Sequence, residues 1–238
     1  MSVAIALQNV SAVYRLGGKP VPLLNRANLE LLPGRYAVVA PTAADQTAMM
    51  DLLCGRRQPT GGRLRVLGEP SYPIGRLAAF ALPVTGIAVV RHLAALFDLN
   101  YAETRDFVED LLMEDRQHMS RAMRHWPTDA RRRFSMIAGI LRPFDVYLID
   151  GALPQASGDE TFMRRWTPLF AARCENATLL MATRQLHIAR AIAQGVLYIA
   201  DGQARLCDLS HLRLPEAIQM DAADPVEREL DTLDQEFI

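Results

Sequence analysis

"VVAPTAADQTAMMDLLCG" (residues 38–55) reads as an apolar strand that runs into a short loop and then into an apolar helix. The strand–loop–helix that cradles nucleotide phosphates has this layout, and its pattern is G-x-x-x-x-G-K-[ST]. Ala40 stands at the first glycine of that pattern, Asp45 at the second and Gln46 at the lysine, and only Thr47 fits. The stretch therefore indicates either a former nucleotide site or an ordinary strand–turn–helix.

The composition is that of a globular protein. With 238 residues, half of them hydrophobic and 22% charged, the chain can form one large α/β domain, or one domain plus a small subdomain, with ample material for a core. No apolar run reaches the ~18–20 residues that a membrane span needs, and the N-terminus lacks the features of a signal peptide. Three cysteines among apolar neighbours, Cys54, Cys174 and Cys207, predict buried reduced thiols in a cytoplasmic protein.

Charge is nearly balanced overall but unevenly distributed. The net charge of -1 predicts no strong attraction to nucleic acid or to a membrane surface. Residues 213–238 form an acidic tail, in which the stretch 221–238 holds seven acids against Arg228 alone, and we expect a solubilising appendage there. Lys19 is the only lysine in the chain, so no second lysine can replace the one missing from the phosphate loop.

Hydrophobic periodicity predicts strands that alternate with helices. The predicted elements are strands in 3–16 and 24–40 broken by loops around Gly17, Gly18 and Gly34, a helix over 47–53, a short strand in 60–70, a mostly helical stretch over 90–123, a helix over 130–142, a strand at 144–150, a strand at 176–183, a helix over 185–194 and a hairpin centred on Asp201 and Gly202. This order predicts a parallel α/β core with a helical insert at about residues 87–130.

Several stretches resemble one known family in order and spacing. "NVSAVYRL" (9–16) resembles its opening strand, with Tyr14 at the place of an aromatic residue that stacks on adenine. "YPIGRLAAFALPVTGIAVVRHL" (72–93) resembles the pattern W-P-[IV]-G-x-x-x-G-x-F-Q-x-x-L-T-G-x-x-N, with Tyr72, Pro73, Ile74, Gly75, Phe80, Thr85 and Gly86 as the corresponding residues. "FDVYLIDGA" (144–152) resembles F-D-x-Y-L-[IV]-D-E, the strand that supplies a magnesium-side Asp and a catalytic Glu. The family is the ATP-binding subunits of ABC transporters, and the chain looks most like those of capsular polysaccharide exporters.

The resemblance implies a P-loop NTPase-like nucleotide-binding domain over residues 1–212, with a mostly parallel sheet core, an antiparallel β subdomain and a helical subdomain. It implies ATP and magnesium as cofactors, held by Tyr14, by residues Ala43, Ala44, Asp45, Gln46 and Thr47, and by Asp150, with Thr47 and Asp150 toward the metal. It also implies exporter membrane subunits as partners, head-to-tail dimers, and a cytoplasmic location at the inner face of the cell membrane.

The phosphate loop departs from the family pattern. Ala43, Ala44 and Asp45 stand where the family has Gly-Ala-Gly, whose glycines let consecutive N–H groups form an anion nest. Asp45 adds a negative charge beside the place of the phosphate oxygens, and Gln46 cannot supply the charge of the lysine. We therefore expect weak or no binding of ATP.

The catalytic positions depart as well. Gly151 replaces the Glu that polarises the attacking water, Arg184 stands at the switch His, and Ala81 replaces a coupling Gln. The signature aligns with residues 128–131 and places Asp129, with the wrong charge, where the family has residues that contact the partner's γ-phosphate. Because phosphoryl transfer depends on positioning and charge stabilisation, these losses predict that the chain has no catalytic residues for ATP hydrolysis.

Single residues keep alternative interpretations. Tyr14 is a relic adenine platform or a half-buried strand aromatic, and Thr47 is a helix N-terminal residue or a magnesium ligand. Asp150 binds a metal or braces the neighbouring loop. The arginines at 131–133 form a solvated helix face by default, or contact an acidic partner.

Three functions follow as hypotheses. The first is a catalytically silent homologue with a structural or regulatory role in capsular polysaccharide export, as an adaptor for membrane subunits or synthesis machinery, alone or paired with an intact ATP-binding subunit. The second is an active exporter ATPase with divergent motifs. The third is a cleft that binds a less charged ligand, such as part of a sugar nucleotide.

Overall fold

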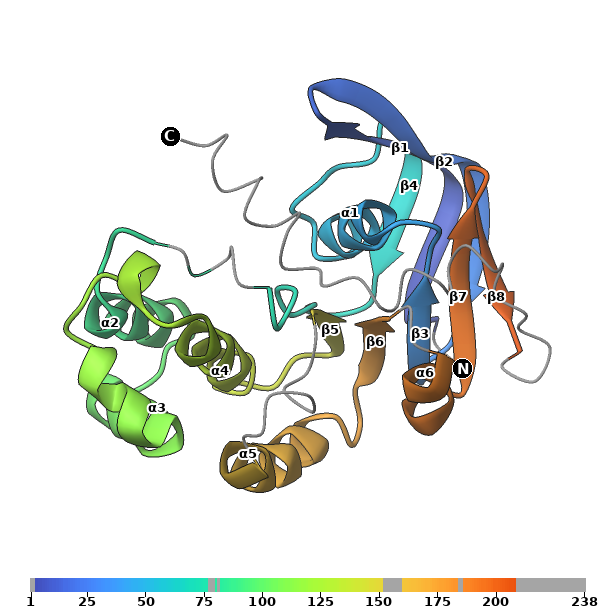
Figure 1. Cartoon of the computed structure of the whole chain (residues 1–238). Coiled ribbons are helices and arrows are strands. Elements are labelled where there is room, and N and C mark those ends of the chain that lie inside the picture. The colour runs from blue at the N-terminus through green and yellow to red at the C-terminus, as the bar shows by residue number, and fades with distance from the viewer. Residues whose placement is uncertain (1–2, 77–79, 81, 152–159, 184–185, 209–238) are drawn as a thin grey trace. The chain divides into compact units, whose positions relative to one another are not determined.

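The computed structural model describes residues 3–76, 80, 82–151, 160–183 and 186–208, with residues 186–188 described by their backbone alone. The chain divides into two compact units (Figure 1). The first unit comprises Met1–Pro73, Phe144–Asp150 and Asn176–Ile238, and the second comprises Ile74–Pro143 and Gly151–Glu175. The second unit thus includes residues on both sides of the helical insert predicted at 87–130.

The first unit contains an antiparallel sheet of three strands. Its strands are β1 (Ile5–Leu16), β2 (Lys19–Leu31) and β4 (Gly61–Val66), in the order β2-β1-β4. Gly17 and Gly18 join β1 to β2 with φ of 54° and 75°, which is the left-handed backbone that a two-residue hairpin turn requires. This sheet matches the antiparallel β subdomain that the resemblance implies.

A five-stranded sheet forms the rest of the first unit's framework. Its order is β5-β6-β3-β7-β8, made of β3 (Arg35–Val39), β5 (Val146–Asp150), β6 (Thr178–Ala182), β7 (Gly195–Ala200) and β8 (Gln203–Cys207). The first four strands are parallel and β8 is antiparallel to β7. Asp150 pairs with Ala182, which pairs with Val38, so the carboxyl ends of these strands meet at one edge.

Helices cover both faces of the parallel strands, as their near-continuous apolar sequences predict. Helix α1 (Ala43–Leu53) lies between the two sheets, and its Met49, Met50 and Leu52 belong to the main core cluster (Figure 1). Helix α6 (Leu186–Ile192) packs against β3 on the other face, where Ala189 joins a second small cluster. The predicted parallel α/β core is therefore confirmed.

The second unit is helical. It contains α2 (Gly86–Leu96), α3 (Tyr101–Leu112), the 3-10 helices η2 (Met113–His118) and η3 (Met123–His125), α4 (Thr128–Ala138) and α5 (Glu160–Arg173). Trp126 makes an edge-on contact with Phe134, with ring centroids 5.6 Å apart. The Trp166 indole N–H donates to the Met136 carbonyl at 3.0 Å, which fixes α5 to α4. The sequence prediction contained no helix at α5, whose interior carries Pro168.

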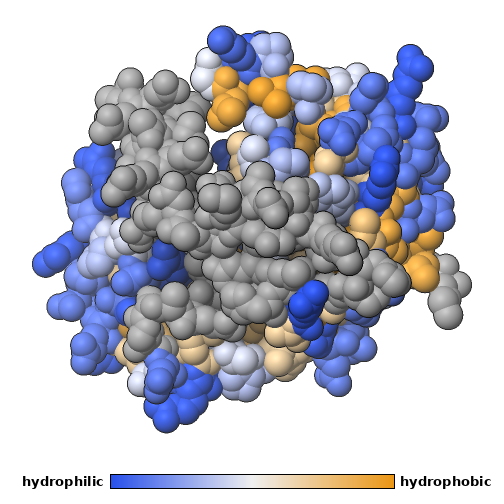
Figure 2. Space-filling view, turned by 45° about the vertical axis from the view of Figure 1, so that its right-hand side comes forward, coloured by the Kyte–Doolittle hydropathy of each residue, from blue (hydrophilic) through white to orange (hydrophobic). Residues whose placement is uncertain are grey.

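Large apolar side chains are exposed at scattered positions. Figure 2 shows one face, on which hydrophilic residues predominate among the coloured ones and apolar residues form smaller patches. Among the described residues, the large apolar ones that are exposed are Val13, Leu16, Leu32, Leu67, Val84, Leu96, Leu169 and Leu206. Within the part of the chain that the structure describes, no helix has the length and apolarity needed to cross a membrane. The three cysteines are free thiols, but only Cys174 is fully buried.

Candidate functional site

Several predicted site residues gather at the carboxyl edge of the five-stranded sheet. The loop after β3 leads from Ala40 into α1, Asp150 ends β5, and Thr183 follows β6. In open α/β sheets this edge is where ligands bind. The first unit therefore brings residues 40–47 and Asp150 to one edge of the sheet, and their role in binding a nucleotide stays a prediction.

Helix α1 begins at Ala43, four residues before the start predicted from the sequence. Thr42 is its N-cap, with extended backbone (φ -123°, ψ 157°), and the Thr42 Oγ1 accepts from the Asp45 N–H at 3.1 Å. The Thr42 hydroxyl also donates to Asp45 Oδ2 at 2.7 Å. The pattern T-x-x-D over residues 42–45 resembles a capping box, and this signal was missed when the loop was compared only with the phosphate-binding pattern.

Thr47 consequently lies in the second turn of α1 and is not a helix N-terminal residue, so that interpretation was wrong. Asp150 is half-buried at the end of β5, against which α1 packs. Both residues have interactions within the protein. Their assignment to magnesium stays a prediction.

Tyr14 is joined to the loop by its hydroxyl group, which donates to Asp45 Oδ1 at 2.9 Å. The residue is only 5% exposed and belongs to the main core cluster. Burial, together with the hydrogen bond and the charge of Asp45, raises the pKa of Tyr14 to about 12. An adenine ring could stack on this side chain only after it left its present packing.

Gln46, at the position of the phosphate-loop lysine, points into the protein. Its side-chain amide donates to the Val38 carbonyl at 2.9 Å and to the Thr183 carbonyl at 3.0 Å. The residue is 5% exposed. Gln46 therefore links the carboxyl ends of β3 and β6, which are adjacent parallel strands.

The backbone of the loop differs from an anion nest. None of residues 40–47, all of which the structure describes, has a positive φ. The Asp45 N–H donates to Thr42 Oγ1, and the Gln46 N–H donates to the Thr42 carbonyl at 3.3 Å. Two of the N–H groups at the start of α1 are thus satisfied within the protein.

Gly151 occupies the predicted place of the catalytic Glu. Its φ is 139°, and a Cβ added there would lie 2.7 Å from the Gly75 carbonyl oxygen. Gly75 itself has φ of 93°, and its N–H donates to Ser135 Oγ at 3.0 Å in the buried part of the second unit. The backbone at Gly151 therefore leaves no room for a side chain without a local shift.

The predicted signature residues form the start of α4. Pro127 is the N-cap, without a side-chain cap hydrogen bond. Asp129 pairs with Arg132 at 3.0 Å, and Arg133 pairs with Asp115. The side chains of Arg132 and Arg133 are 16% and 22% exposed, so the default prediction of a solvated arginine face was wrong for these two residues.

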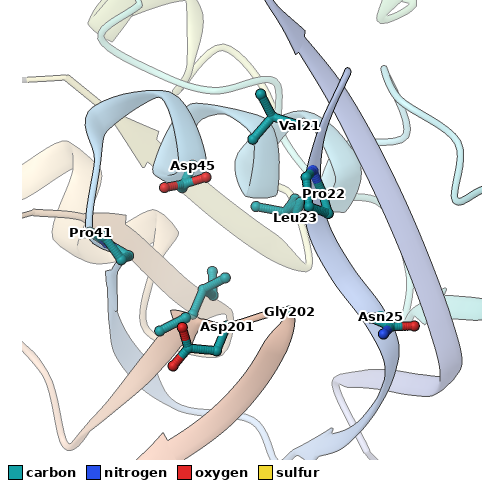
Figure 3. Close-up of a pocket in the computed structure, with 10 residues that line it drawn as sticks. Val21, Pro22, Leu23, Asn25, Pro41, Asp45, Asp201 and Gly202 are labelled. Atoms are coloured by element: carbon teal, nitrogen blue, oxygen red, sulfur yellow. The ribbon is translucent and has the colours of Figure 1, made fainter. Parts of the chain in front are cut away.

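A pocket of about 390 Å³ lies beside the loop in the first unit. Its walls are Val21, Pro22, Leu23, Asn25, Pro41, Asp45, Ile199, Ala200, Asp201 and Gly202. Figure 3 shows Asp45 at the start of α1 and Asp201 on the β7–β8 hairpin, both at this pocket. The described lining residues thus include two carboxylates and no lysine or arginine.

Two predicted positions lie outside the described residues: Arg184, at the place of the switch His, and Ala81, at the place of the coupling Gln. Thr42 and Thr183 were not among the predicted site residues. Thr42 had a usable signal in the T-x-x-D spacing. Thr183 accepts from Gln46 through its backbone carbonyl and donates to the Val38 carbonyl through its N–H, and no residue type gives a signal for such backbone contacts.

In sequence the chain is similar to several ATP-binding proteins, two of them named for transport or export. No family model matches it. It is 23% identical to the polysialic acid transport ATP-binding protein KpsT of Escherichia coli over 77% of this chain and 82% of that protein. It is also 23% identical to the ATP-binding protein BexA of Haemophilus influenzae, over 75% and 82% of the two chains, and 22% identical to the capsule polysaccharide export ATP-binding protein CtrD of Neisseria meningitidis, again over 75% and 82%.

Solved structures establish the fold. The dimeric bacterial ABC transporter cassette MJ0796 matches with a TM-score of 0.63 at 17% identity, over 86% of this chain and 98% of that one. An ATP binding subunit of an ABC transporter matches with a TM-score of 0.64 at 17% identity, over 97% and 98%. The chain therefore has the fold of an ABC cassette and is a homologue, at low identity, of ATP-binding proteins of capsule polysaccharide exporters.

Proposed function

We propose that this chain is an ABC nucleotide-binding-domain homologue without ATPase activity, with a structural or regulatory role in polysaccharide export. The observation that carries the proposal is the Gln46 amide, which donates to the Val38 and Thr183 carbonyls. In nucleotide-binding loops a lysine at this position reaches the β- and γ-phosphates. Here the side chain is neutral and is directed into the fold, so it gives no cationic contact to a phosphate.

The rest of the loop supports the same proposal. A nest for phosphates needs free N–H groups and a backbone that glycine provides, whereas this loop has no left-handed residue and carries the Asp45 carboxylate. The residues present do not fit a triphosphate. Gly151 supports the loss of hydrolysis, because the local backbone excludes the side chain of a general base.

The partners proposed are exporter membrane subunits or polysaccharide-synthesising machinery at the inner face of the cell membrane. The relatives named for transport and export motivate this location. Since both the phosphate loop and the signature are altered, pairing with an intact ATP-binding subunit in a head-to-tail dimer would spoil both composite sites. A scaffold or regulator is therefore favoured over a motor.

An active exporter ATPase is the second candidate. One observation favours it: Thr47 and Asp150 keep the residue types of the family pattern. Thr47 lies on α1 and Asp150 ends β5, and α1 packs against β5. These are the residue types that hold magnesium in P-loop enzymes. In this case magnesium and ATP would bind despite the altered loop.

The test combines isothermal titration of the purified protein with Mg-ATP and an ATPase assay on the same sample. The proposal predicts no turnover and no binding at millimolar Mg-ATP. Turnover that disappears in Asp150→Asn would establish the second candidate and overturn the first. An unrelated surface carboxylate exchange, Asp98→Asn, serves as the matched control because Asp98 is exposed and is not one of the predicted site residues.

A further inference from the structure

The Asp45 carboxylate is held by hydrogen-bond donors from two separate elements. Tyr14 on β1 donates to Oδ1 at 2.9 Å, and Thr42 before α1 donates to Oδ2 at 2.7 Å. The carboxylate also lies in the first turn of α1, where the helix dipole favours a negative charge. In nucleotide-binding loops the anion at such a helix start is a phosphate of the ligand.

The lining of the pocket beside the loop includes negatively charged side chains. Asp45 and Asp201 line it from different elements, α1 and the β7–β8 hairpin (Figure 3). Its described lining residues contain no lysine or arginine. A phosphate that approached the start of α1 through this pocket would meet two carboxylates and no side-chain cation from those residues.

We propose that the Asp45 carboxylate occupies the place that a bound phosphate has at the start of such a helix. Its negative charge excludes anionic ligands from the loop. The hydrogen bonds from Tyr14 and Thr42 tie β1 to the start of α1 by contacts that need no nucleotide. The inference deepens the proposed function and rests on it, because it explains how a loop that has lost its ligand stays ordered. In this proposal the exclusion of anionic ligands depends on the side chain of Asp45.

The experiment compares Asp45→Asn with the wild type in titrations with inorganic pyrophosphate, without magnesium. This exchange keeps the shape of the side chain and removes its charge. A like charge about 4 Å away weakens anion binding by about a thousandfold at an effective dielectric constant near 20. We expect no measurable binding by the wild type, and saturable binding by Asp45→Asn that is at least tenfold tighter than the weakest affinity the titration can detect.

Asp201→Asn is the matched control, since it removes the same charge from the same pocket but from a residue outside the loop. An asparagine side chain also tolerates the positive φ of 53° at this hairpin position. The control should gain less than Asp45→Asn. Equal affinities in the two variants, or pyrophosphate binding by the wild type, would overturn the inference.

Tyr14→Phe keeps the test decisive if Asp45→Asn fails to fold. This variant keeps the carboxylate but removes one of its two donors, so we expect a lower Tm and still no pyrophosphate binding. An unchanged Tm would overturn the proposed tie between β1 and α1. The proposed function fails by a different result, which is ATP turnover by the wild type, so the two failures can be told apart.

Discussion

Gln46 is the residue whose role differs most from that of its counterpart in a phosphate loop. Its amide donates to the carbonyl of Val38 on β3 and to that of Thr183 just after β6. A buried polar group that loses its hydrogen-bond partner costs about 1–3 kcal/mol. Gln46→Leu should therefore lower the free energy of unfolding by about that amount, measured by urea unfolding. In this variant the Val38 carbonyl still accepts a hydrogen bond from the Thr183 N–H at 3.1 Å. We therefore expect a loss of unfolding free energy at the lower end of that range.

Gln58→Leu is a suitable comparison for this prediction. Gln58 is exposed and its amide donates to the Gly55 carbonyl at 3.3 Å. Surface exchanges of this kind change stability by less than about 0.5 kcal/mol. A Gln46→Leu protein as stable as Gln58→Leu would show that the strand ends do not depend on this amide.

Tyr14 gives the loop a characteristic response to alkaline solution. Because its pKa is raised to about 12 in the folded protein, against about 10 for an unperturbed tyrosine, folding favours the neutral phenol. This contribution is fully present below about pH 10 and is lost as the pH rises through about 12. We expect the unfolding free energy of the wild type to fall more steeply between these values than that of Tyr14→Phe.

Urea unfolding of both proteins at a series of pH values measures this difference directly. The other five tyrosines and Lys19 are present in both proteins. Their contributions are common to both proteins and cancel in the comparison. Parallel curves for the wild type and Tyr14→Phe would mean that the hydroxyl of Tyr14 is not buried against Asp45.

At the scale of elements, strands were easier to predict than the start of α1. The strands β3, β5 and β6 are short apolar runs buried on both faces, and their sequences show this without further information. Helix α1 begins at Ala43 because Thr42 caps it. The start of α1 was predicted from the phosphate-loop pattern alone, so the capping role of Thr42 was missed. Helix α5 has an interior Pro168, which normally argues against a helix.

The cap of α1 can be tested by changing Thr42 alone. Thr42→Ala removes the acceptor of the Asp45 N–H and one donor to the Asp45 carboxylate, and the loss of an N-cap costs about 0.5–2 kcal/mol. Thr42→Ser keeps the hydroxyl and should remain close to the wild type. Thermal unfolding of the three proteins measures the effect, and equal Tm values for the Ala and Ser variants would argue that the hydroxyl does not stabilise α1.

The turn after β5 imposes a second local requirement. Gly151→Ala should lower stability, because its Cβ would meet the Gly75 carbonyl oxygen at 2.7 Å in addition to the strain of a φ of 139°. Backbone strain of this kind costs about 1–3 kcal/mol. Gly55→Ala separates the two causes, since Gly55 has φ of 77° but nothing within 4 Å of an added Cβ. A smaller loss in Gly151→Ala than in Gly55→Ala would contradict the steric argument.

For the whole molecule, the order of apolar strands and helices was enough to predict a parallel core, and the spacing of the motifs was enough to predict an ABC-type cassette. The contacts that define the site were not predictable in the same way. Tyr14 and Asp45 are 31 positions apart, and only the packing of β1 and α1 in one core brings them together. Gln46 binds backbone carbonyls, and its partners follow from strand register and not from residue type.

The wild type as a whole should show no stabilisation by nucleotide. A ligand at 100 times its Kd raises the unfolding free energy by about 2.7 kcal/mol, which for a chain of this size corresponds to a Tm increase of about 5–10 °C. Because the loop carries a carboxylate, has a neutral residue in place of lysine and contains no left-handed residue, we expect an unchanged Tm in millimolar Mg-ATP. The polysialic acid transport ATP-binding protein KpsT provides a positive control, for which the Tm should rise. A saturable increase of several degrees in this chain would show that Mg-ATP binds to a loop whose internal hydrogen bonds must then open, and would favour an active or nucleotide-sensing exporter subunit.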